Sequence, residues 1–434
     1  MTKIDAFRGY RYNPEKVGDL AAVLAPPYDV IDPPLQDKLY AKSPFNVVRI
    51  DLAKEENDLS RYQVSQHAYN TWKQKDVLRQ DERPSLYLYF QTYSLPDGRR
   101  LTRRGFIARR RLESFAEGGV KPHEQTFPGP KADRLKLMQA TNASFSPIFA
   151  LYPDPAQEAG AQLAKLSAGK PDLEIRDEKG DEHRLWRVDD AEAIARLLGT
   201  VRDRPLMIAD GHHRYETALA YAEEQKALLG DKYTGQEPFN YVMMYICALE
   251  DPGLVVLPTH RVLAQRPEIN EEIFRGLVSK YAKVQAFSVA EADAAIRLLE
   301  EEGAREHALA WVHDGKVEVL VFDVEKLLES QSLNHLHFAI RDLDVTVLHD
   351  LVLEELLGVS KGAQREYGNI LYIKEAKEAI QLAQEKGTYA FLMNATKLKQ
   401  IEAVIAIGEK MPQKSTFFYP KPLTGLVFYD FASA

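Results

Sequence analysis

The chain has 434 residues, more than one hydrophobic core ordinarily supports, so two or three domains are expected. Hydrophobic residues make up 45% and charged residues 28%, which is typical of globular proteins and excludes collagen, a coiled coil and wholesale disorder. The net charge of -8 opposes a protein that coats nucleic acid along its whole length. The single cysteine, Cys247, excludes an intrachain disulfide and cysteine-rich metal sites, and its apolar neighbours predict a core residue.

Two features of the sequence favour a soluble, cytoplasmic protein with no membrane partner. No stretch reaches the roughly 18 consecutive apolar residues that a membrane helix needs. The first residues, Met-Thr-Lys-Ile-Asp-Ala-Phe-Arg, lack the apolar core of a signal peptide.

The first 115 residues are expected to form a β-rich region that begins with a stiff loop. Four prolines between positions 26 and 34 fix the backbone angle φ there and push the preceding residues toward extended geometry. A strand is predicted over residues 46–52 and a helix over residues 60–72.

The clearest hairpin of this region joins strands at 86–93 and 100–111 through an Asp-Gly turn at 96–98. Seven arginines lie between Arg99 and Arg111. A solvated strand of alternating charge is one interpretation of these arginines, and a face that binds anions or nucleic acid is the other.

Residues 116–265 alternate between predicted strands and helices. The predicted helices are 131–141 and 213–229, and the predicted strands are 146–151, 206–209 and 254–257. We expect this segment to be the second domain.

Beyond residue 265 the sequence changes to acidic amphipathic helices and short strands, which indicates a third domain over 266–434. The predicted helices are 268–281, 289–302 and 345–357, and the predicted strands are 308–312, 317–322 and 371–373. Strands and helices alternate along the whole chain, so the expected fold class is mixed α/β (α+β).

The strongest functional motif is the point where a short buried strand passes through Asp210 and Gly211 into a helix. The first turn of a helix leaves backbone N–H groups for anions, and a glycine lets a ligand approach the backbone closely. His212, His213 and Arg214 add donors at the same point. The motif predicts a phosphate or nucleotide site, with an ordinary Asp N-cap and surface histidines as the alternative.

A second motif is the loop Pro-His-Glu-Gln-Thr at 122–126. His123 and Glu124 on a proline-fixed loop are suited to a general base, a metal ligand or a substrate clamp. Lys131 and Arg134 follow, three residues apart on one face of the next helix, as further donors to phosphate. A capping loop with solvated charges is the alternative.

His260 and Arg261 stand at the end of a predicted strand, where α/β proteins commonly gather substrate-binding residues. Structural roles for both are the alternative. Lys-Ser-Thr at 414–416 resembles the end of a phosphate loop, but the glycine spacing excludes a Walker motif.

The histidines and one glutamate also raise the question of a zinc, iron or manganese site. The candidate ligands are His123, Glu124, His212, His213 and His260. Adjacent side chains rarely bind one ion, and no His-x-x-x-His pair is present on a helix, so this alternative is less favoured.

Five motifs together resemble the domain-of-unknown-function family 1015 over essentially the full length of the chain. They are Ala-Pro-Pro-Tyr-Asp-Val at 25–30, Pro-His-Glu-Gln-Thr at 122–126, Asp-Gly-His-His-Arg-Tyr-Glu-Thr-Ala at 210–218, Leu-Pro-Thr-His-Arg at 257–261 and Met-Pro-Gln-Lys-Ser-Thr-Phe-Phe-Tyr-Pro-Lys at 411–421.

The segment from Asp210 to Arg214 is also similar to the nucleotide-binding box of the ParB/sulfiredoxin-like fold, which includes ParB CTPases, sulfiredoxin and free-serine kinases. This resemblance implies a ParB/sulfiredoxin-like core at 116–265, a β-rich region at 1–115 and a C-terminal α/β extension at 266–434. It also implies Mg²⁺ and ATP or ADP as cofactors. The segment between Glu124 and the box is longer than a compact domain of this fold needs.

What the resemblance implies about function is a nucleotide-dependent kinase for a small hydroxyl metabolite, with free L-serine as the first candidate. Glu124 then matches the general base, and His123 and Lys131 would orient phosphates or substrate. His260 and Arg261, at their strand end, are the candidate substrate residues. Asp210 is the expected protein contact for magnesium.

Two alternatives stay open. One is a nucleotide-binding regulatory or partner-binding protein without turnover. The arginine-rich strand at 99–111 supports nucleic acid as its partner, whereas the charge of -8 and the lack of a helix-turn-helix oppose it. The other is a phosphohydrolase or nuclease that uses the histidines.

Overall fold

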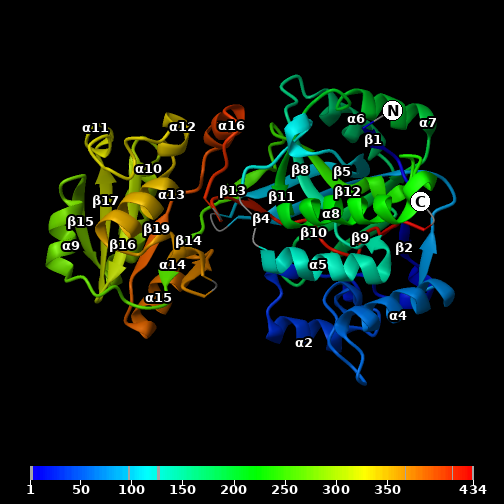
Figure 1. Cartoon of the computed structure of the whole chain (residues 1–434), viewed down its shortest axis with the longest axis horizontal. Coiled ribbons are helices and arrows are strands. Elements are labelled where there is room, and N and C mark those ends of the chain that lie inside the picture. The colour runs from blue at the N-terminus through cyan, green and yellow to red at the C-terminus, as the bar shows by residue number, and fades with distance from the viewer. Residues whose placement is uncertain (1–2, 96–97, 125–127, 367, 413, 433–434) are drawn as a thin grey trace. The chain divides into compact units, whose positions relative to one another are not determined.

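The structure is a computed structural model of the whole chain, and it describes every residue except 1–2, 96–97, 125–127, 367, 413 and 433–434 (Figure 1). The chain forms two compact units. The first comprises Met1–Pro122, Thr126–Leu254 and Pro420–Ala434, and the second comprises His123–Gln125 and Val255–Tyr419. The C-terminal segment therefore belongs to the first unit.

The first unit is built on a nine-stranded sheet in the order β6-β11-β8-β12-β5-β4-β10-β9, with β1 paired to β5. Its strands are β1 Ile4–Asp5, β4 Leu86–Ser94, β5 Arg100–Arg111, β6 Val120–Lys121, β8 Ile148–Tyr152, β9 Leu173–Arg176, β10 Glu182–Val188, β11 Leu206–Asp210 and β12 Tyr241–Ala248. The predicted hairpin forms its centre, because β4 and β5 pair antiparallel. Pro96 and Asp97 of the hairpin turn lie outside the described residues.

Two short ladders complete the strands of this unit. They pair β2 Tyr10–Tyr12 with β3 Leu78–Gln80, and β7 Ala143–Ser144 with β21 Tyr429–Asp430. The second ladder fixes the C-terminal segment to the first unit.

Helices pack on both sides of this sheet, with α6 and α7 on one side and α5 on the other (Figure 1). The helices are α1 Pro14–Val17, α2 Pro33–Lys42, α3 Val48–Asp51, α4 Arg61–Gln74, α5 Pro128–Thr141, α6 Glu158–Leu166, α7 Ala191–Gly199 and α8 His212–Leu229. Helix α5 packs against both α4 and α8. Local signals start several of them: Ser60 and Gln63 form a capping box before α4, and Asp32 caps α2.

The strand predicted over 46–52 is wrong, because this segment contains the helix α3. The β-branched residues there favour a strand. However, Oδ1 of Asn46 accepts the backbone N–H of Val48 at 3.0 Å, and its Nδ2 donates to the carbonyl of Ala22 at 2.8 Å. These bonds hold the backbone in a turn that starts the helix.

The division of the first 265 residues also differs from the predicted domains. The sheet takes β4 and β5 from the segment 1–115, and β8, β11 and β12 from the segment 116–265. Hydrogen bonds between β5 and β12 join the two segments in one compact unit.

The second unit contains a six-stranded sheet in the order β15-β17-β16-β19-β14-β18 and a separate two-stranded ladder, β13 with β20. The strands are β13 Val255–Leu257, β14 His260–Leu263, β15 Ala282–Ser288, β16 His307–His313, β17 Lys316–Phe322, β18 Ile370–Ile373, β19 Ala390–Met393 and β20 Phe417–Tyr419.

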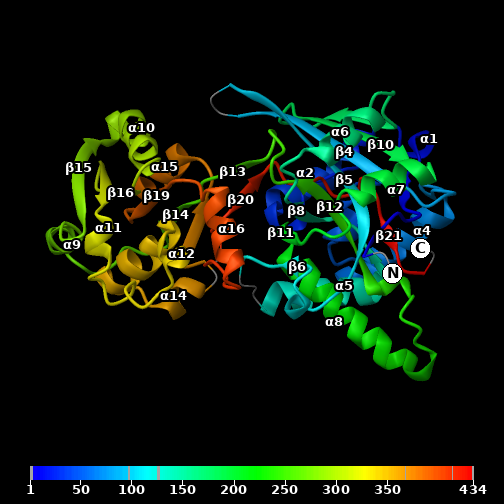
Figure 2. The ribbon, with the colours of Figure 1, turned by 90° about the horizontal axis from the view of Figure 1, so that it is seen from above.

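Helices α10 and α15 cover one face of this sheet, and α9 and α14 lie on the other (Figure 2). The helices are α9 Glu271–Val278, α10 Ala292–Gly303, α11 Val324–Leu327, α12 Phe338–Arg341, α13 Asp344–Thr346, a π-helix at Val347–Leu356, α14 Lys361–Arg365, α15 Ala376–Lys386 and α16 Leu398–Ala406. On the α10 side the core holds small aliphatic residues such as Ala310 and Ala383. On the α9 side Phe274 meets Trp311 edge-on at 4.7 Å.

The mixed α/β class is confirmed, but the segment 1–115 is not predominantly β, because it contains the helices α1 to α4 beside its strands. The helix predicted over 345–357 is present, but most of it has the wider turns of a π-helix. Within the described residues, no helix has both the length and the apolar character that a membrane crossing requires.

Candidate functional site

The junction between β11 and α8 has the geometry that the sequence motif predicts. Gly211 adopts a φ of 98°, a left-handed value that favours glycine, and a Cβ at this position would meet the guanidinium of Arg214 at 3.0 Å. Helix α8 starts at His212 without a side-chain cap. Asp210 is therefore not an ordinary N-cap, and its carboxylate has a different role.

The carboxylate of Asp210 lies between two cations. Its Oδ2 accepts from Nη2 of Arg214 at 2.5 Å, and its Oδ1 lies 2.7 Å from Nζ of Lys421. Lys421 also forms an ion pair with Asp29. Arg214 donates in addition to the carbonyl of Pro147 at 2.5 Å. We call this row of alternating charges the Asp29–Lys421–Asp210–Arg214 chain.

Burial and the neighbouring charges shift the pKa of Lys421 in opposite directions. Burial lowers the pKa of Lys421, but the carboxylates of Asp210 and Asp29 outweigh it and hold that pKa above its ordinary value. The side chain of Lys421 is only 11% exposed, so Lys421 is a buried ammonium beside the start of α8. Because both carboxylates are matched by cations, the chain has no net charge.

Lys421 and Asp29 are members of this site that the sequence motifs did not single out. The signal for both was present, because Asp29 stands in the segment 25–30 and Lys421 in the segment 411–421 on which the family resemblance depends. The sequence alone did not show that the tertiary fold brings both residues to Asp210.

The residues around Asp210 do not fit the magnesium ion that the sequence predicts there. Arg214 and Lys421 already hold its two carboxylate oxygens. A dication at the same carboxylate would have to displace one of these cations or share an oxygen with it.

Lys131 lies on the first turns of α5 and reaches across to α8. Its Nζ lies 2.8 Å from Oε2 of Glu216, and its carbonyl accepts from the hydroxyl of Thr217 at 3.4 Å. The predicted phosphate donor thus ties α5 to the first turns of the helix that starts at His212.

Arg134 on the same helix is buried and paired with two carboxylates. Nη1 lies 3.2 Å from Oδ1 of Asp51 and Nη2 lies 2.6 Å from Oδ2 of Asp133. Its guanidinium stacks 4.1 Å over the ring of Tyr28, whose pKa burial raises to about 12. Since Tyr28 precedes Asp29, Arg134 supports the segment that carries one end of the charge chain.

His123 and Glu124 belong to the second unit, where the backbone of His123 accepts the N–H of Met411 at 2.8 Å. The side chain of His123 is fully buried, and its Nε2 lies 2.8 Å from Oγ1 of Thr416. Oε1 of Glu124 accepts the hydroxyl of Thr416 at 3.1 Å and its backbone N–H at 3.3 Å. Thr416 therefore holds one oxygen of the Glu124 carboxylate in place.

Arg261 lies within the electrostatic reach of Glu124 in the same unit. Its Nη2 donates to the carbonyl of Lys414 at 2.8 Å, and Nη1 donates to the carbonyl of Thr259. Burial lowers the pKa of Arg261 to about 10, and the charge of Glu124 opposes this shift only in part. A buried guanidinium held by carbonyls next to a carboxylate is suited to a substrate with a negative group.

His260, the neighbouring substrate candidate, has a structural contact. Its Nδ1 accepts the backbone N–H of Met393 at 3.0 Å. Burial, together with the charge of Arg261, lowers the pKa of His260 to about 4, so the ring is neutral at pH 7. It joins the ends of β14 and β19.

The predicted site residues thus form two groups. Asp210, Gly211, Arg214, Lys131 and Arg134 belong to the first unit. The first residues of α8 belong to it too: His212, which is buried, and His213, which is half-buried.

The second group belongs to the other unit and comprises His123, Glu124, His260 and Arg261. Gln125 and Thr126 of the second motif lie outside the described residues.

The five-residue metal set is divided between the two units in the same way. Among the residues that the structure describes, the group of three that could hold a metal ion is Glu271, His313 and Asp314, none of them predicted. Arg266 forms ion pairs with both carboxylates of that group.

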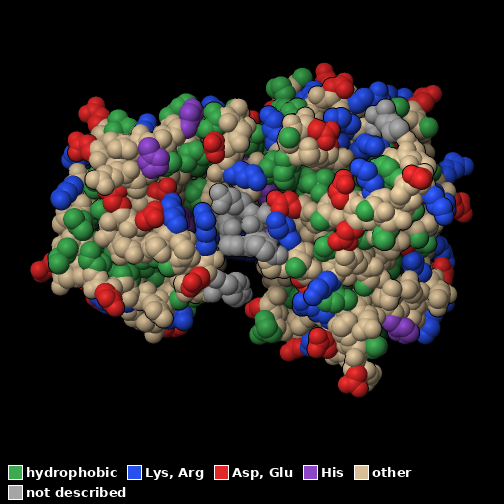
Figure 3. Space-filling view, in the orientation of Figure 1, with side chains coloured by type: hydrophobic (Ala, Val, Ile, Leu, Met, Phe, Trp, Pro, Cys, Tyr) green, Lys and Arg blue, Asp and Glu red, His purple; other side chains and the backbone are tan. Residues whose placement is uncertain are grey.

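The arginine-rich strand β5 does not present a row of free cations. Arg103 and Arg110 are buried, Arg104 lies 3.2 Å from Asp251, and Arg110 lies 3.0 Å from Glu113. Figure 3 shows Lys and Arg side chains interspersed with Asp and Glu on the visible face. The strand therefore gives no support to a nucleic-acid face.

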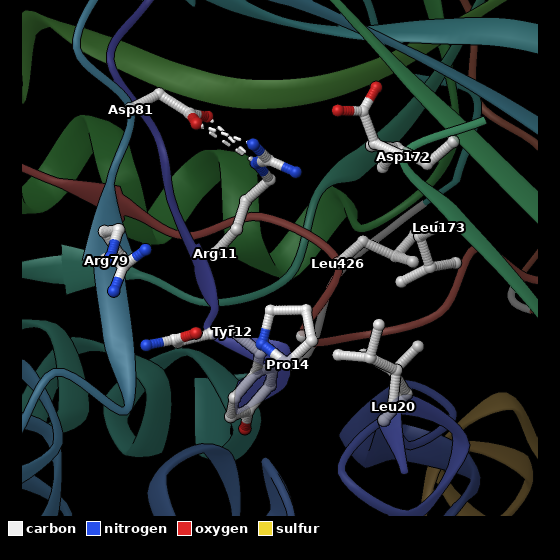
Figure 4. A pocket seen from close by; sticks show the side chains of 13 residues that line it. Arg11, Tyr12, Pro14, Leu20, Arg79, Asp81, Asp172, Leu173 and Leu426 are labelled. Carbon is white, nitrogen blue, oxygen red and sulfur yellow. Dashed lines mark hydrogen bonds and ion pairs between the residues drawn. The ribbon is translucent and has the colours of Figure 1, made fainter. Parts of the chain in front are cut away.

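A pocket of about 140 Å³ lies elsewhere on the first unit (Figure 4). Arg11 points into it and forms a two-pronged ion pair with Asp81, with 2.7 Å from Nη2 to Oδ1 and 3.0 Å from Nε to Oδ2. Asp81 also accepts the hydroxyl of Tyr87 at 2.8 Å. None of the predicted site residues lines this pocket.

The chain is distantly similar to solved structures, among them a single-residue variant of free serine kinase in complex with AMP. That match has 14% identity and a TM-score of 0.34, and it covers 69% of this chain and 84% of that chain. A conserved hypothetical protein from Pyrococcus furiosus matches at 15% identity and a TM-score of 0.33, with 71% and 90% covered. C-terminally truncated SbnI from Staphylococcus aureus matches at 12% identity and a TM-score of 0.33, with 70% and 82% covered. Similarities at this level carry no argument about activity.

No curated protein sequence matches the chain. The model of the family described as "Protein of unknown function (DUF1015)" matches residues 4–346. Because this match spans most of the chain, the protein belongs to the DUF1015 family.

Proposed function

We propose that the protein is a phosphotransferase that uses ATP or ADP to phosphorylate the hydroxyl group of a small metabolite, with free L-serine as the first acceptor to test. The observation that carries the proposal is the Asp29–Lys421–Asp210–Arg214 chain at the uncapped start of α8. Phosphate oxygens are matched by the positive end of a helix and by nearby lysine and arginine side chains.

The charge chain supports a phosphate site because its cations are fixed before a ligand arrives. Lys421 and Arg214 are each held by Asp210 at 2.7 Å or less, so little side-chain entropy is lost when phosphate binds. Gly211 supports it too, since its left-handed backbone and missing Cβ keep the start of the helix accessible.

The second unit offers the group that a hydroxyl acceptor needs. Thr416 holds Oε1 of Glu124, and Oε2 has no hydrogen bond or ion pair with any residue that the structure describes. A carboxylate with one oxygen fixed and one available is suited to accept a proton. The buried guanidinium of Arg261, which lies within the electrostatic reach of Glu124, would favour an acceptor that carries a carboxylate.

In the proposed reaction the acceptor hydroxyl oxygen attacks the terminal phosphorus of the nucleotide, and its proton passes to a carboxylate, a role for which Glu124 is the candidate. The new O–P bond forms as the P–O bond to the leaving nucleotide breaks, so the nucleotide leaves one phosphate shorter. Lys421 and Arg214 would offset the charge on the phosphate oxygens.

The test is a phosphotransfer assay of the full chain with ATP or ADP and L-serine, in which O-phosphoserine and the shortened nucleotide are measured together. We expect turnover in the wild type and a loss of at least about 100-fold in Glu124→Gln, with unchanged nucleotide affinity. Glu409→Gln, at an exposed glutamate of the same unit, is the matched control.

Nucleotide binding without any phosphorylated product from L-serine, L-threonine or glycerol would contradict the kinase and favour a regulator without turnover. Hydrolysis of the nucleotide that persists in Glu124→Gln would favour a phosphohydrolase.

A further inference from the structure

Arg103 is a fully buried cation near the centre of the first unit. It lies on β5, opposite Gln91 on β4, and its exposed fraction is 0%. Burying a guanidinium removes its hydration, which costs several kcal/mol unless a negative group or hydrogen-bond acceptors replace the water. The contacts of Arg103 therefore decide whether the folded protein provides that replacement.

Within the described residues, the hydrogen bonds of Arg103 replace only part of the hydration that its guanidinium loses. Nη2 of Arg103 donates to Oε1 of Gln91, whose Nε2 donates to the carbonyl of Lys421 at 3.1 Å. Nε and Nη1 of Arg103 have no hydrogen-bond partner among the described residues. Gln91 is a neutral amide, so the positive charge has no counterion in this contact.

The carboxylates that act on the neighbouring tyrosines lie close to other side chains. Asp251, which influences Tyr245, lies 3.2 Å from Nε of Arg104. Asp177, which influences Tyr89, lies 3.4 Å from Nε2 of His183. No described carboxylate lies within ion-pair distance of Arg103.

Two aromatic rings flank the guanidinium. The ring centroid of Phe149 lies 4.4 Å from Cζ of Arg103, and that of Tyr245 lies 5.3 Å away. The hydroxyl of Tyr245 is also buried and has no hydrogen-bond partner among the described residues. Burial raises the pKa of Tyr245 well above its ordinary value, so this hydroxyl stays protonated and can donate.

From this arrangement we propose that the first unit contains a buried site for a compact, singly charged anion, bound by Nε and Nη1 of Arg103 and the hydroxyl of Tyr245. These groups supply three donor atoms with four hydrogens and one positive charge, which match a halide ion or the carboxylate of a small acid. A phosphate dianion carries more negative charge than the single guanidinium can neutralise, so phosphate is not the expected ligand. A cation is not expected either, because the rings of Phe149 and Tyr245 offer it only their π faces.

This site is distinct from the phosphate site of the proposed function. Its residues lie on β4, β5, β8 and β12, whereas the charge chain surrounds the end of β11. The two are linked through Gln91, which contacts Arg103 on one side and the backbone of Lys421 on the other. Occupation of the anion site therefore stabilises the segment that carries Lys421.

The test is the thermal unfolding of the full chain in 150 mM chloride and in 150 mM gluconate, an anion too large for the site. We expect chloride to raise the unfolding midpoint by about 5 °C, since an anion that binds only the folded state stabilises it. Formate and acetate are run in parallel. A larger rise with these acids than with chloride assigns the site to a carboxylate, and the reverse assigns it to a halide.

Arg103→Met should abolish the anion-specific rise, and Tyr245→Phe, which removes one hydroxyl, should reduce it. Arg100→Met, at an exposed arginine of the same strand, should leave it unchanged. Equal midpoints in all four salts, or a rise that persists in Arg103→Met, would overturn the proposal. If Arg103→Met does not fold, crystal structures of the wild type grown in bromide and in formate decide: a bromide or a formate ion next to Arg103 supports the site, and the absence of both refutes it.

Discussion

Nζ of Lys421 lies 2.7 Å from Oδ1 of Asp210, although the two residues stand in different halves of the sequence. The contact exists because the chain returns to the first unit at Pro420, after the second unit is complete. The site at the start of α8 therefore requires the C-terminal segment, and it cannot be assembled by the strand and helix that carry its sequence motif alone.

Lys421→Met is expected to lower the free energy of unfolding of the first unit by about 1–3 kcal/mol, because it leaves the partly exposed carboxylates of Asp29 and Asp210 with one cation fewer. Urea unfolding followed by circular dichroism measures this loss. Lys421→Arg, which keeps the charge, should lose less.

The double variant Asp210→Asn with Lys421→Met checks the cause of that loss. If the unpaired carboxylates are responsible, removing one of them should recover part of the stability, and the two effects should be far from additive. A loss below about 1 kcal/mol in Lys421→Met would show that the ion pairs contribute little.

Gly211→Ala is expected to cost about 1–3 kcal/mol, since φ is 98° and the new Cβ would meet the guanidinium of Arg214 at 3.0 Å. Gly230→Ala at the other end of α8 is the matched control, because Gly230 also has a positive φ but no neighbour within 4 Å. Nucleotide affinity, measured by calorimetry, should fall in Gly211→Ala only. Equal affinities in the two variants would separate Gly211 from the phosphate site.

Thr416→Val is expected to reduce kcat of the proposed reaction by about 10- to 100-fold while leaving nucleotide affinity unchanged, because Glu124 loses the hydroxyl that holds Oε1. Thr416→Ser should restore most of the rate. The KM for the nucleotide should be the same in both variants, because the substitution acts on the position of Glu124 and not on the phosphate site. A rate in Thr416→Ser as low as that in Thr416→Val would contradict the positioning role.

The ion pair between His307 and Asp344 predicts a pH-dependent stability of the second unit. Burial lowers the pKa of His307, but the hydrogen bond from Nδ1 to Asp344 at 2.7 Å outweighs burial and raises it. A raised folded-state pKa adds stability that is complete below about pH 6.5 and is lost as the pH rises through the folded-state value.

Asp344→Asn should therefore cost about 1–2 kcal/mol at pH 6 and clearly less at pH 9, as measured by urea unfolding at both values. His335→Gln, at an exposed histidine of the same unit, controls for general histidine titration. A cost that is equal at both pH values, or larger at pH 9, would contradict the assignment.

Patterns within a few consecutive residues predicted several strands and helices correctly. The aromatic alternation on both sides of an Asp-Gly turn predicted the β4–β5 hairpin, and the buried run before Asp210 predicted β11 and the start of α8. The strand expected at 46–52 failed because one side chain, Asn46, fixes a turn that the β-branched residues around it do not indicate.

The sequence predicted only part of the candidate site. Asp210, Gly211 and Arg214 are contiguous and share one motif, whereas Asp29 and Lys421 come from distant segments that only the tertiary fold unites. Thr416 was named only within a run that resembles a phosphate loop, and its contact with Glu124 was not predicted because the two residues lie far apart in the sequence. Arg134 was predicted as a phosphate donor, and no pattern in the sequence revealed its carboxylate partners, Asp51 and Asp133.

The most direct test of the phosphate site is isothermal titration of the full chain with ATP, ADP and CTP, in the presence of Mg²⁺ and again in EDTA, beside Arg214→Ala. The charge chain predicts saturable binding of at least one nucleotide in the wild type, weakened at least about tenfold in the variant because one of the two fixed cations is gone. Nucleotide binding that remains in EDTA would show that magnesium is not needed, as expected if Arg214 and Lys421 hold both carboxylate oxygens of Asp210. Absence of binding by all three nucleotides, or equal affinity in Arg214→Ala, would contradict the assignment of the start of α8 as a phosphate site.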